Sequence, residues 1–455
     1  MAVLSTPGFN LQPSAEKVAL STNYITNFNF LNQYLPDTYE KEFERYGNRT
    51  VASFLRMVGA EMPSNSDLIK WAEQGRLHTK YVNVTTVDAD GTANPTFTVN
   101  DSGVTNIAIR IGQTVMLSTG AVSVKAIVIA TPTSTTFQVA CYDLNGLAGS
   151  GSTYSVFVYG SEFKKGTNGM VGSLEAEDVF FENKPIILKD KYAVSGSDMA
   201  QIGWVEVTTE NGANGYLWYL KSEHETRLRF DDYLETAMIE AVPMDNVANA
   251  AIADGSEGIF YVVNNRGNVW SGGNPTTLAE WDTIISRLDK QGAIEENVVF
   301  LNRAFGFDID DMLASQNSYG AGGTSYGLFD NDKDMALNLG FTGFRRGYDF
   351  YKTDWKYLND PTMRGGLTGT GSVNGLLVPA GSTSVYDQVL GKNAKRPFLH
   401  VRYRASETED RRYKTWITGS AGGAQNSDLD AMEVQFLSER AVCTLGANNF
   451  FIFKD

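Results

Sequence analysis

The sequence predicts an α+β chain that carries a small all-β barrel or sandwich domain as an insertion. Three observations predict this fold class. Residues 81–160 are poor in charge, rich in Thr, Val, Ser and Gly, and free of any helical period. Residues 216–241 form one long helical pattern, and from residue 246 onward strand-like runs alternate with helical ones.

The composition excludes several classes of protein. The chain has 455 residues, which gives a prior of about three domains. Its two cysteines, Cys141 and Cys443, stand far apart, which argues against a disulfide scaffold or zinc knuckle and fits a reducing compartment. The net charge of −15 predicts repulsion from nucleic acid, so any DNA contact is local. The sequence has neither a membrane-length apolar run nor a signal peptide, so the default compartment is the cytoplasm.

The first part of the chain is predicted to be an arm followed by short helices. Residues 1–28 are polar and show no sustained period, which predicts an extended segment. After Pro36 the run Thr38–Tyr46 reads as the start of a charged helix, and residues 48–58 predict a short helix with one apolar face.

The segment 81–160 is predicted to fold as an independent β domain. Alternation predicts strands over residues 105–111, 121–130 and 136–143, and turn-forming Gly, Asn, Asp and Pro separate five or six such runs. The flanks on both sides are polar and strand-compatible, as two legs of one long hairpin would be. We therefore expect this domain to be inserted at the tip of a hairpin.

The long helix follows Gly215 and covers roughly 26 residues, or about 39 Å at 1.5 Å per residue. Its charged residues fall on one face, and such a length suits a structural spine. The predicted apolar stripe consists of Leu217, Leu220, His224, Leu228, Tyr233 or Leu234, and Met238.

The remainder of the chain is predicted to be α+β. Strands are expected at 258–264 and 297–302, and a helix at Leu278–Gln291. Residues 303–380 are rich in Gly and aromatic residues and are expected to be dominated by loops. The final 60 residues return to four strand-like runs.

Two short motifs suggest chemistry but lack the context that it needs. Ser325 lies in a G-x-S-x-G match, Gly323 to Gly327, with His400 after it, but no apolar strand precedes it and no helix follows, so a loop is favoured over a nucleophile. Asp330, Asp332 and Asp334 are spaced like calcium ligands. However, Met335 and Phe341 occupy positions that require Gly and Glu, so surface acidity is favoured.

Two acidic clusters have simpler structural interpretations. Asp308, Asp310 and Asp311 could supply an acid/base pair, but a helix N-terminus, which favours acids, explains them more simply. The neighbours Glu223, His224 and Glu225 cannot converge on one metal ion from a helix, so His224 is expected to be a hydrogen-bonded core histidine.

The remaining candidates are a glycine motif and three basic clusters. Gly369, Gly371 and Gly375 miss the dinucleotide-binding spacing and are expected to lie in a loop. The basic clusters are expected to form salt-bridging faces rather than nucleic-acid sites. They are Arg345 with Arg346, Arg402 with Arg404, and Arg411 with Arg412 and Lys414. The sequence therefore assigns no catalytic residue, no cofactor site and no metal site, and it predicts a protein that is not an enzyme.

Three stretches of the sequence resemble a known family, the major capsid proteins of tailed phages with the HK97 fold, and most closely those of crAss-like podoviruses. The stretches are residues 30–43 (FLNQYLPDTYEKEF), residues 48–81 (NRTVASFLRMVGAEMPSNSDLIKWAEQGRLHTKY) and residues 439–454 (ERAVCTLGANNFFIFK). The resemblance spans most of the chain and is weakest in 81–160 and 303–380. An arm, a hairpin, a spine helix and a terminal α+β domain without a catalytic set also suit a lattice subunit.

The resemblance implies a division of the chain into named parts. These are an N-terminal arm (1–47), the start of the E-loop region (48–80), an inserted β-domain (81–160), the E-loop return (161–212), the P-domain spine helix (213–245), the A-domain (246–400) and C-terminal strands that return to the A- and P-domains (401–455).

The resemblance also implies a function and partners. The chain would assemble in the bacterial host cytoplasm into hexamers and pentamers of an icosahedral virion capsid that encloses double-stranded DNA. The portal and scaffolding or auxiliary decoration proteins are expected partners, with weak non-specific DNA contact and no membrane. Relatives begin with a cleaved scaffolding segment, whereas here Met1 leads almost directly into the arm, so a separate scaffold or none is expected. No covalent cross-link is assigned.

Two other classes of function stay open on the sequence. A carbohydrate-binding or glycan-cleaving virion protein would bind sugar with the segment 81–160 and use carboxylates at 308–311 or 330–334 as acid and base. A tail or neck ring protein would share the arm and the β domain but would form a closed ring of about 6 or 12 copies.

Overall fold

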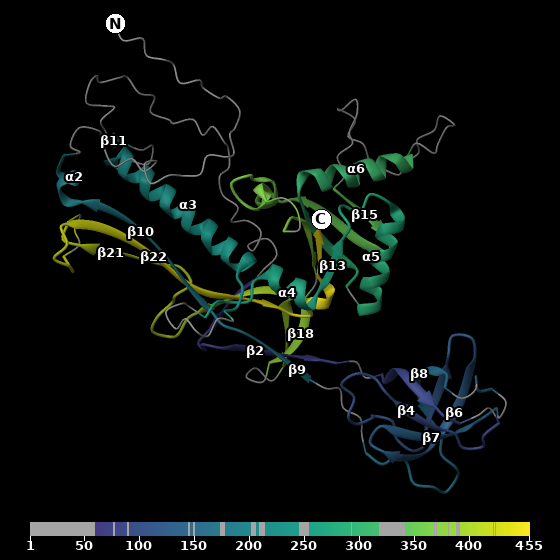
Figure 1. Ribbon diagram of the computed structural model, residues 1–455. Helices are drawn as coiled ribbons and strands as arrows, with labels where there is room; N and C mark the ends of the chain where they lie inside the picture. The colour runs from purple at the N-terminus through teal and green to yellow at the C-terminus, as the bar shows by residue number, and fades with distance from the viewer. Residues whose placement is uncertain are drawn as a thin grey trace. The chain divides into compact units, whose positions relative to one another are not determined.

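The computed structural model describes residues 60–455, and Figure 1 shows its ribbon. The undescribed positions inside that range are 76–77, 89–90, 144–145, 149–150, 173–177, 202–205, 209–213, 245–253, 293, 318–341, 368, 370, 381, 388–391, 422 and 424. The predicted arm and the helix expected at 48–58 therefore lie outside the described residues.

The chain forms two compact units, each built from its own contacts. The barrel unit is residues 71–181, and the large unit is residues 1–70 together with 182–455. The chain leaves the large unit within strand β2 (Ile69–Gln74) and returns within strand β9 (Asp178–Asn183), and these two strands pair with each other. Helices and strands are both present, so the chain is of mixed α and β composition.

The barrel unit is a closed six-stranded barrel with strand order β3-β4-β7-β6-β5-β8. Its strands are β3 (Lys80–Thr86), β4 (Thr96–Val99), β5 (Gln113–Ser118), β6 (Ser123–Thr133), β7 (Thr136–Cys141) and β8 (Thr153–Ser161). The strands predicted over 121–130 and 136–143 are confirmed as β6 and β7. All neighbouring barrel strands run antiparallel, and closure removes the free edges that an open sheet would leave.

The barrel core is a single cluster of aliphatic and aromatic side chains. Phe97 stacks on Phe137 with ring centroids 5.6 Å apart and meets Tyr154 edge-on at 5.4 Å. The strand expected over 105–111 is wrong, because that segment is extended without forming a strand. Its Ile107 and Ile109 are buried as alternation predicts, but the Ala108 amide donates to the Tyr81 hydroxyl at 2.8 Å instead of a strand partner.

The first sheet of the large unit joins segments that are far apart in the sequence. It has the order β1 (Ala60–Ser64), β20 (Leu399–Arg404), β22 (Ala431–Thr444) and β10 (Ile186–Ser195), and β21 (Lys414–Gly419) also pairs with β22. Strand β10 runs antiparallel along β22 for ten residue pairs, and β1 runs parallel to β20. The strands predicted in the last part of the chain are confirmed as β20, β21, β22 and β23 (Phe451–Lys454).

Helix α3 (Leu217–Glu240) confirms the long helix and packs on one face of this sheet, alongside β10 and β22 in Figure 1. Phe230 and Leu234 contact the side chains of Met432, Val434 and Phe436. The predicted stripe is partly wrong. Leu234 and Met238 are buried as predicted, but Thr226 and Phe230 are buried in place of His224 and Leu228, because the sheet contacts this part of the helix two positions away from the expected line.

His224 is exposed, so the prediction of a core histidine is also wrong.

A further helix and two small ribbons belong to the large unit. They are α2 (Gly196–Gln201), the pair β11 (Glu206–Thr208) and β12 (Asn214–Tyr216), and the pair β18 (Ser382–Asp387) and β19 (Lys392–Pro397).

The second sheet of the large unit has six strands in the order β13-β23-β17-β14-β16-β15. Its other strands are β13 (Asn268–Ser271), β17 (Val373–Pro379), β14 (Glu296–Leu301), β16 (Tyr348–Asp354) and β15 (Gly343–Arg346). The helices of this region are α4 (Ile259–Arg266), α5 (Leu278–Gln291), α6 (Arg303–Asn317) and α7 (Lys356–Asn359), with 3-10 turns at Arg364–Gly366 and Ala447–Asn449.

Two predictions for this region are confirmed and three are wrong. Loops do not dominate the described part of 303–380, because α6, β15, β16, α7 and β17 make up most of it. Helix α5 has the predicted bounds and begins with a capping box between Thr277 and Glu280, while β14 matches the strand predicted at 297–302. The strand predicted at 258–264 is helix α4, because a short buried apolar run does not distinguish helix from strand. Gly375, expected in a loop, lies in the buried strand β17.

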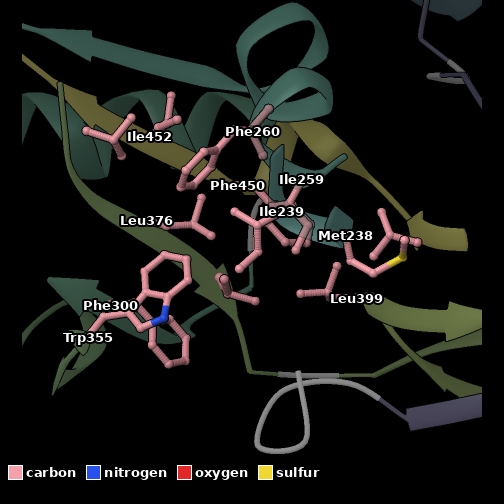
Figure 2. Packing of buried hydrophobic residues seen from close by; sticks show 14 of the residues in the cluster. Met238, Ile239, Ile259, Phe260, Phe300, Trp355, Leu376, Leu399, Phe450 and Ile452 are labelled. Atoms are coloured by element: carbon pink, nitrogen blue, oxygen red, sulfur yellow. The ribbon is translucent and has the colours of Figure 1, made fainter. Parts of the chain in front are cut away.

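One apolar cluster ties the end of α3 to both sheets, as Figure 2 shows. Met238 and Ile239 of α3 pack with Ile259 and Phe260 of α4, and Leu399, Phe450 and Ile452 complete the cluster. Trp355 lies beside Phe300, with ring centroids 5.9 Å apart. Among the described residues no helix is long and apolar enough to span a membrane.

Candidate functional site

The motifs that suggested chemistry do not form a reaction centre in the described part of the chain. Ser325 with its glycines and the three aspartates at 330–334 lie outside the described residues. His400 is buried on β20, where its Nδ1 lies 3.3 Å from the carbonyl oxygen of Pro397. In the strand register His400 lies opposite Cys443 of β22, so it is placed within its own sheet.

The aspartates of α6 have separate structural partners. Asp308 accepts a hydrogen bond of 2.7 Å from the Asn274 amide, and Asp310 pairs with the Lys352 ammonium at 2.5 Å. Both lie in the middle of α6, so their assignment to a helix N-terminus is wrong. The two carboxylates therefore have partners from different elements, an amide for Asp308 and an ammonium for Asp310.

The Glu223, His224 and Glu225 run lies on α3, where adjacent positions point around the helix rather than to one ion. Within the described residues no group of three potential ligands is placed to hold a metal ion. The structure thus brings together neither of the acidic sets as a ligand site.

The basic clusters form salt bridges, as expected. Arg345 pairs with Asp349 at 3.2 Å, and Arg346 donates to Asp282 at 2.8 Å. The other two clusters, from 402–404 and 411–414, meet on the first sheet. There, Lys414 pairs with Glu409 at 2.7 Å.

The first sheet carries a network of arginines and carboxylates, which we call the arginine network: Glu61, Asp67, Arg404, Arg411, Arg412, Glu439 and Arg440. Glu439 is buried and pairs with Arg411 at 2.7 Å and with Arg404 at 3.4 Å. Arg440 lies 3.6 Å from Glu61, which also pairs with Arg412, and Asp67 pairs with Arg404.

The arginine network connects β1 to β20 and β22 and to the turn before β21. Sequence reasoning found the arginines but missed Glu61, Asp67 and Glu439. The adjacent Glu439 and Arg440, which lie in the continuously buried second half of β22, are a usable signal, because charged residues are rarely buried unless they are paired. The network contains four arginines and three carboxylates, so its charges nearly balance.

Two adjoining recesses follow the surface of α3, with volumes of about 390 and 540 Å³. Tyr233, Thr236 and Glu240 line both recesses. The Tyr357 hydroxyl donates to Glu240 at 2.7 Å, and Arg364 donates to the same carboxylate at 2.8 Å.

Burial, with the hydrogen bond to Glu240 as a second cause, raises the pKa of Tyr357. Glu240 is therefore paired with Arg364 and bound by the Tyr357 hydroxyl between the two recesses.

Comparison with known proteins gave matches only among solved structures. No protein-family model matches the chain, and no curated protein matches it. A chain from Microbacterium phage Oxtober96 is 10% identical, with a TM-score of 0.40, over 95% of this chain and 99% of that one.

Two further solved structures show the same level of similarity. A chain from the capsid structure of the cyanophage P-SCSP1u is 8% identical over 98% of each chain, with a TM-score of 0.40. A chain from the capsid of an empty GTA particle is 9% identical over 96% of this chain and 99% of that one, also with a TM-score of 0.40.

Proposed function

We propose that this protein is the major capsid protein of a tailed phage and that it assembles into the hexamers and pentamers of an icosahedral head around double-stranded DNA. The observation that carries the proposal is the architecture of the large unit. A 24-residue helix is fastened along a sheet, and a paired strand ribbon leads away from it to a separate domain.

The large unit has the rigidity that a lattice subunit needs. Arg229 of α3 donates to Asp190 of β10 through two nitrogens, at 2.9 and 3.0 Å, which fixes the helix on the sheet. Phe230 is fully buried beneath it against Phe436. Helix and sheet therefore move as one body, and the position of their outer surfaces is fixed for contacts with neighbouring copies.

The ribbon of β2 and β9 carries exposed apolar side chains. Phe180 is 72% exposed, and Val179 beside it is also exposed. As consecutive residues of a strand they point to opposite faces, so both faces of the ribbon expose apolar surface that a partner can cover. In a shell of many copies, such extended ribbons add contact area on neighbouring subunits while each single contact stays weak.

The net charge of −15 is compatible with enclosing DNA, because a container that bound its contents tightly would oppose packaging and release. The proposal includes the division into arm, E-loop, inserted β-domain, spine helix and A-domain given above. It also includes location in the virion, weak DNA contact, and a portal with scaffolding or decoration proteins as partners.

The test is electron microscopy of the purified protein, together with a Phe180→Asp variant. We expect closed icosahedral shells from the unchanged protein, and folded capsomers or monomers without shells from the variant. Val87→Asp is the matched control, because Val87 is 87% exposed on the barrel unit and its change should leave shells intact. Rings of about 6 or 12 copies, or monomers only, from the unchanged protein would reject the proposal.

A further inference from the structure

The outer surface of the barrel unit carries a group of exposed aromatic and charged side chains, which we call the aromatic face: Lys125, Tyr142, Phe157, Tyr159 and Glu162. Tyr142 is 55% exposed, Tyr159 is 46% exposed and Phe157 is 39% exposed. Large rings are usually buried in a domain of this kind, so three exposed rings on one barrel need an explanation.

The strand register brings these residues together. Tyr154 and Val156 of β8 point into the barrel core, so Phe157 and Tyr159, two residues apart, point outward. Met116 of β5 pairs with Phe157 on one side and with Lys125 on the other, which places the three in one row across adjacent strands.

The Tyr142 amide donates to the Lys125 carbonyl oxygen at 3.0 Å, which brings the end of β7 to the same place.

Each ring is held in position by contacts within the barrel unit. Phe157 and Tyr159 meet edge-on with centroids 6.3 Å apart, and the Lys125 ammonium lies 5.8 Å from the centre of the Tyr159 ring. The Tyr142 hydroxyl donates to the Glu162 carboxylate. A surface that is already ordered loses little conformational entropy when it binds a partner.

The chemistry of the aromatic face selects an uncharged, amphipathic partner. One ammonium and one carboxylate give it no net charge, so it lacks the excess positive charge that binds the phosphates of nucleic acid. Aromatic rings offer apolar faces, while tyrosine hydroxyls, Lys125 and Glu162 offer hydrogen bonds at the rim. A sugar ring presents the complementary pattern, with C–H groups on its faces and hydroxyls around its edge.

We propose that the aromatic face of the barrel unit binds neutral carbohydrate by stacking sugar rings on Tyr159 and Phe157 while Lys125, Tyr142 and Glu162 bind the hydroxyl groups. No bond is made or broken, and the binding does not depend on the capsid role of the large unit. A second copy of this chain is the main competing occupant, and the experiment separates the two.

The experiment uses the full chain on an array of uncharged oligosaccharides built from glucose, galactose, mannose, xylose and N-acetylglucosamine, with sulfated and sialylated oligosaccharides beside them. We expect retention on at least one neutral oligosaccharide and a loss of at least tenfold in Tyr159→Ala. Tyr159→Phe keeps the stacking ring and should retain most binding. Val87→Ala is the control, because Val87 is 87% exposed on the barrel unit but lies outside the aromatic face and the ribbon of β2 and β9, so binding should be unchanged.

Three results would overturn the proposal. The first is no retention on any neutral oligosaccharide, and the second is retention that Tyr159→Ala does not weaken although its circular dichroism is unchanged. The third is a change of sedimentation caused by Tyr159→Ala without any sugar, which would mark the aromatic face as a contact between copies. Retention only on sulfated or sialylated sugars also contradicts a neutral ligand.

Discussion

The barrel unit closes its core between strands that lie within about a hundred residues of each other, whereas the first sheet of the large unit joins strands from opposite ends of the chain. In the barrel, Phe97, Phe137 and Tyr154 come from neighbouring runs of sequence. In the large unit, β10 pairs with β22 from Ile186 with Arg440, 254 positions apart, to Ser195 with Ala431, 236 positions apart. The contiguous barrel segment can therefore fold from its own contacts. The large unit depends instead on contacts between its two chain segments.

The two units also differ in what they bury. The barrel cluster consists of apolar side chains, whereas the first sheet buries Glu439 and Arg440 within its longest strand. Apolar packing tolerates modest change, but a buried charge that loses its partner is costly. We therefore expect changes in one unit to leave the stability of the other almost unchanged, and the following predictions test that independence.

The largest effect is expected from Trp281→Ala in the large unit. Trp281 is fully buried and packs against Phe344 and Phe350, with centroids 4.9 and 5.2 Å away. Removing the ring should lower the free energy of unfolding of the large unit by about 3–5 kcal/mol. Hydrogen exchange during urea unfolding, detected by mass spectrometry, measures the unfolding of the two units separately. Peptides of the barrel unit should keep their protection from exchange.

The converse change, Phe97→Ala, is the control for that prediction. It should destabilise the barrel unit by a similar amount and leave the peptides of the large unit protected. Simultaneous loss of protection in both units from either variant would contradict their independence.

The next effect concerns the arginine network. Glu439→Gln keeps the shape of the side chain but removes the charge that faces Arg404 and Arg411, so we expect a loss of about 2–3 kcal/mol in the large unit. Glu409→Gln is the matched control. Its carboxylate is exposed beside Lys414, so the same change should have a much smaller effect on stability. Equal losses of stability in the two variants would mean that burial of the carboxylate does not determine the cost of removing its charge.

Local patterns in the sequence predicted much of the fold, and they failed where tertiary contacts decide. The strands β6 and β7 and the helix α5 follow from period and capping residues. Helix α4 was mistaken for a strand because a run as short as Ile259–Arg266 satisfies both patterns when it is buried. The buried face of α3 was misplaced because a sheet distant in sequence selects that face.

The functional surfaces were predictable only in part. The arginine network was derivable only in part. The adjacent Glu439 and Arg440 are a local signal, but nothing local marks Glu61, which lies far away in the sequence, as a partner of Arg440. The aromatic face could have been found, since Phe157 and Tyr159 occupy alternate positions of a strand whose other positions are apolar. In that pattern each face of the strand carries an aromatic ring. Because only one face of a barrel strand points into the core, the ring on the other face must be exposed to solvent.

A smaller effect is expected from the helix cap of α5. The Thr277 hydroxyl accepts from the Glu280 amide at 3.3 Å, and Glu280 accepts in return from the Thr277 amide at 2.9 Å. Thr277→Ala should cost about 1 kcal/mol and increase hydrogen exchange in the first turn of α5. Thr283→Ala makes the same change inside the helix and should stay within about 0.5 kcal/mol. An equal effect from both would show that the cap contributes nothing.

The smallest effect is a titration on the aromatic face. The hydrogen bond to Glu162, with smaller contributions from burial and the Glu162 charge, raises the pKa of Tyr142 to about 12 from its ordinary 10.0. Because the folded-state pKa is raised, any stabilisation from this contact is fully present below about pH 10 and is lost as the pH rises through about 12. The absorbance difference at 295 nm between the unchanged protein and Tyr142→Phe should therefore appear with a midpoint near 12. Glu162→Gln should move that midpoint back toward 10, and a midpoint near 10 in the unchanged protein would mean that Glu162 does not hold the ring.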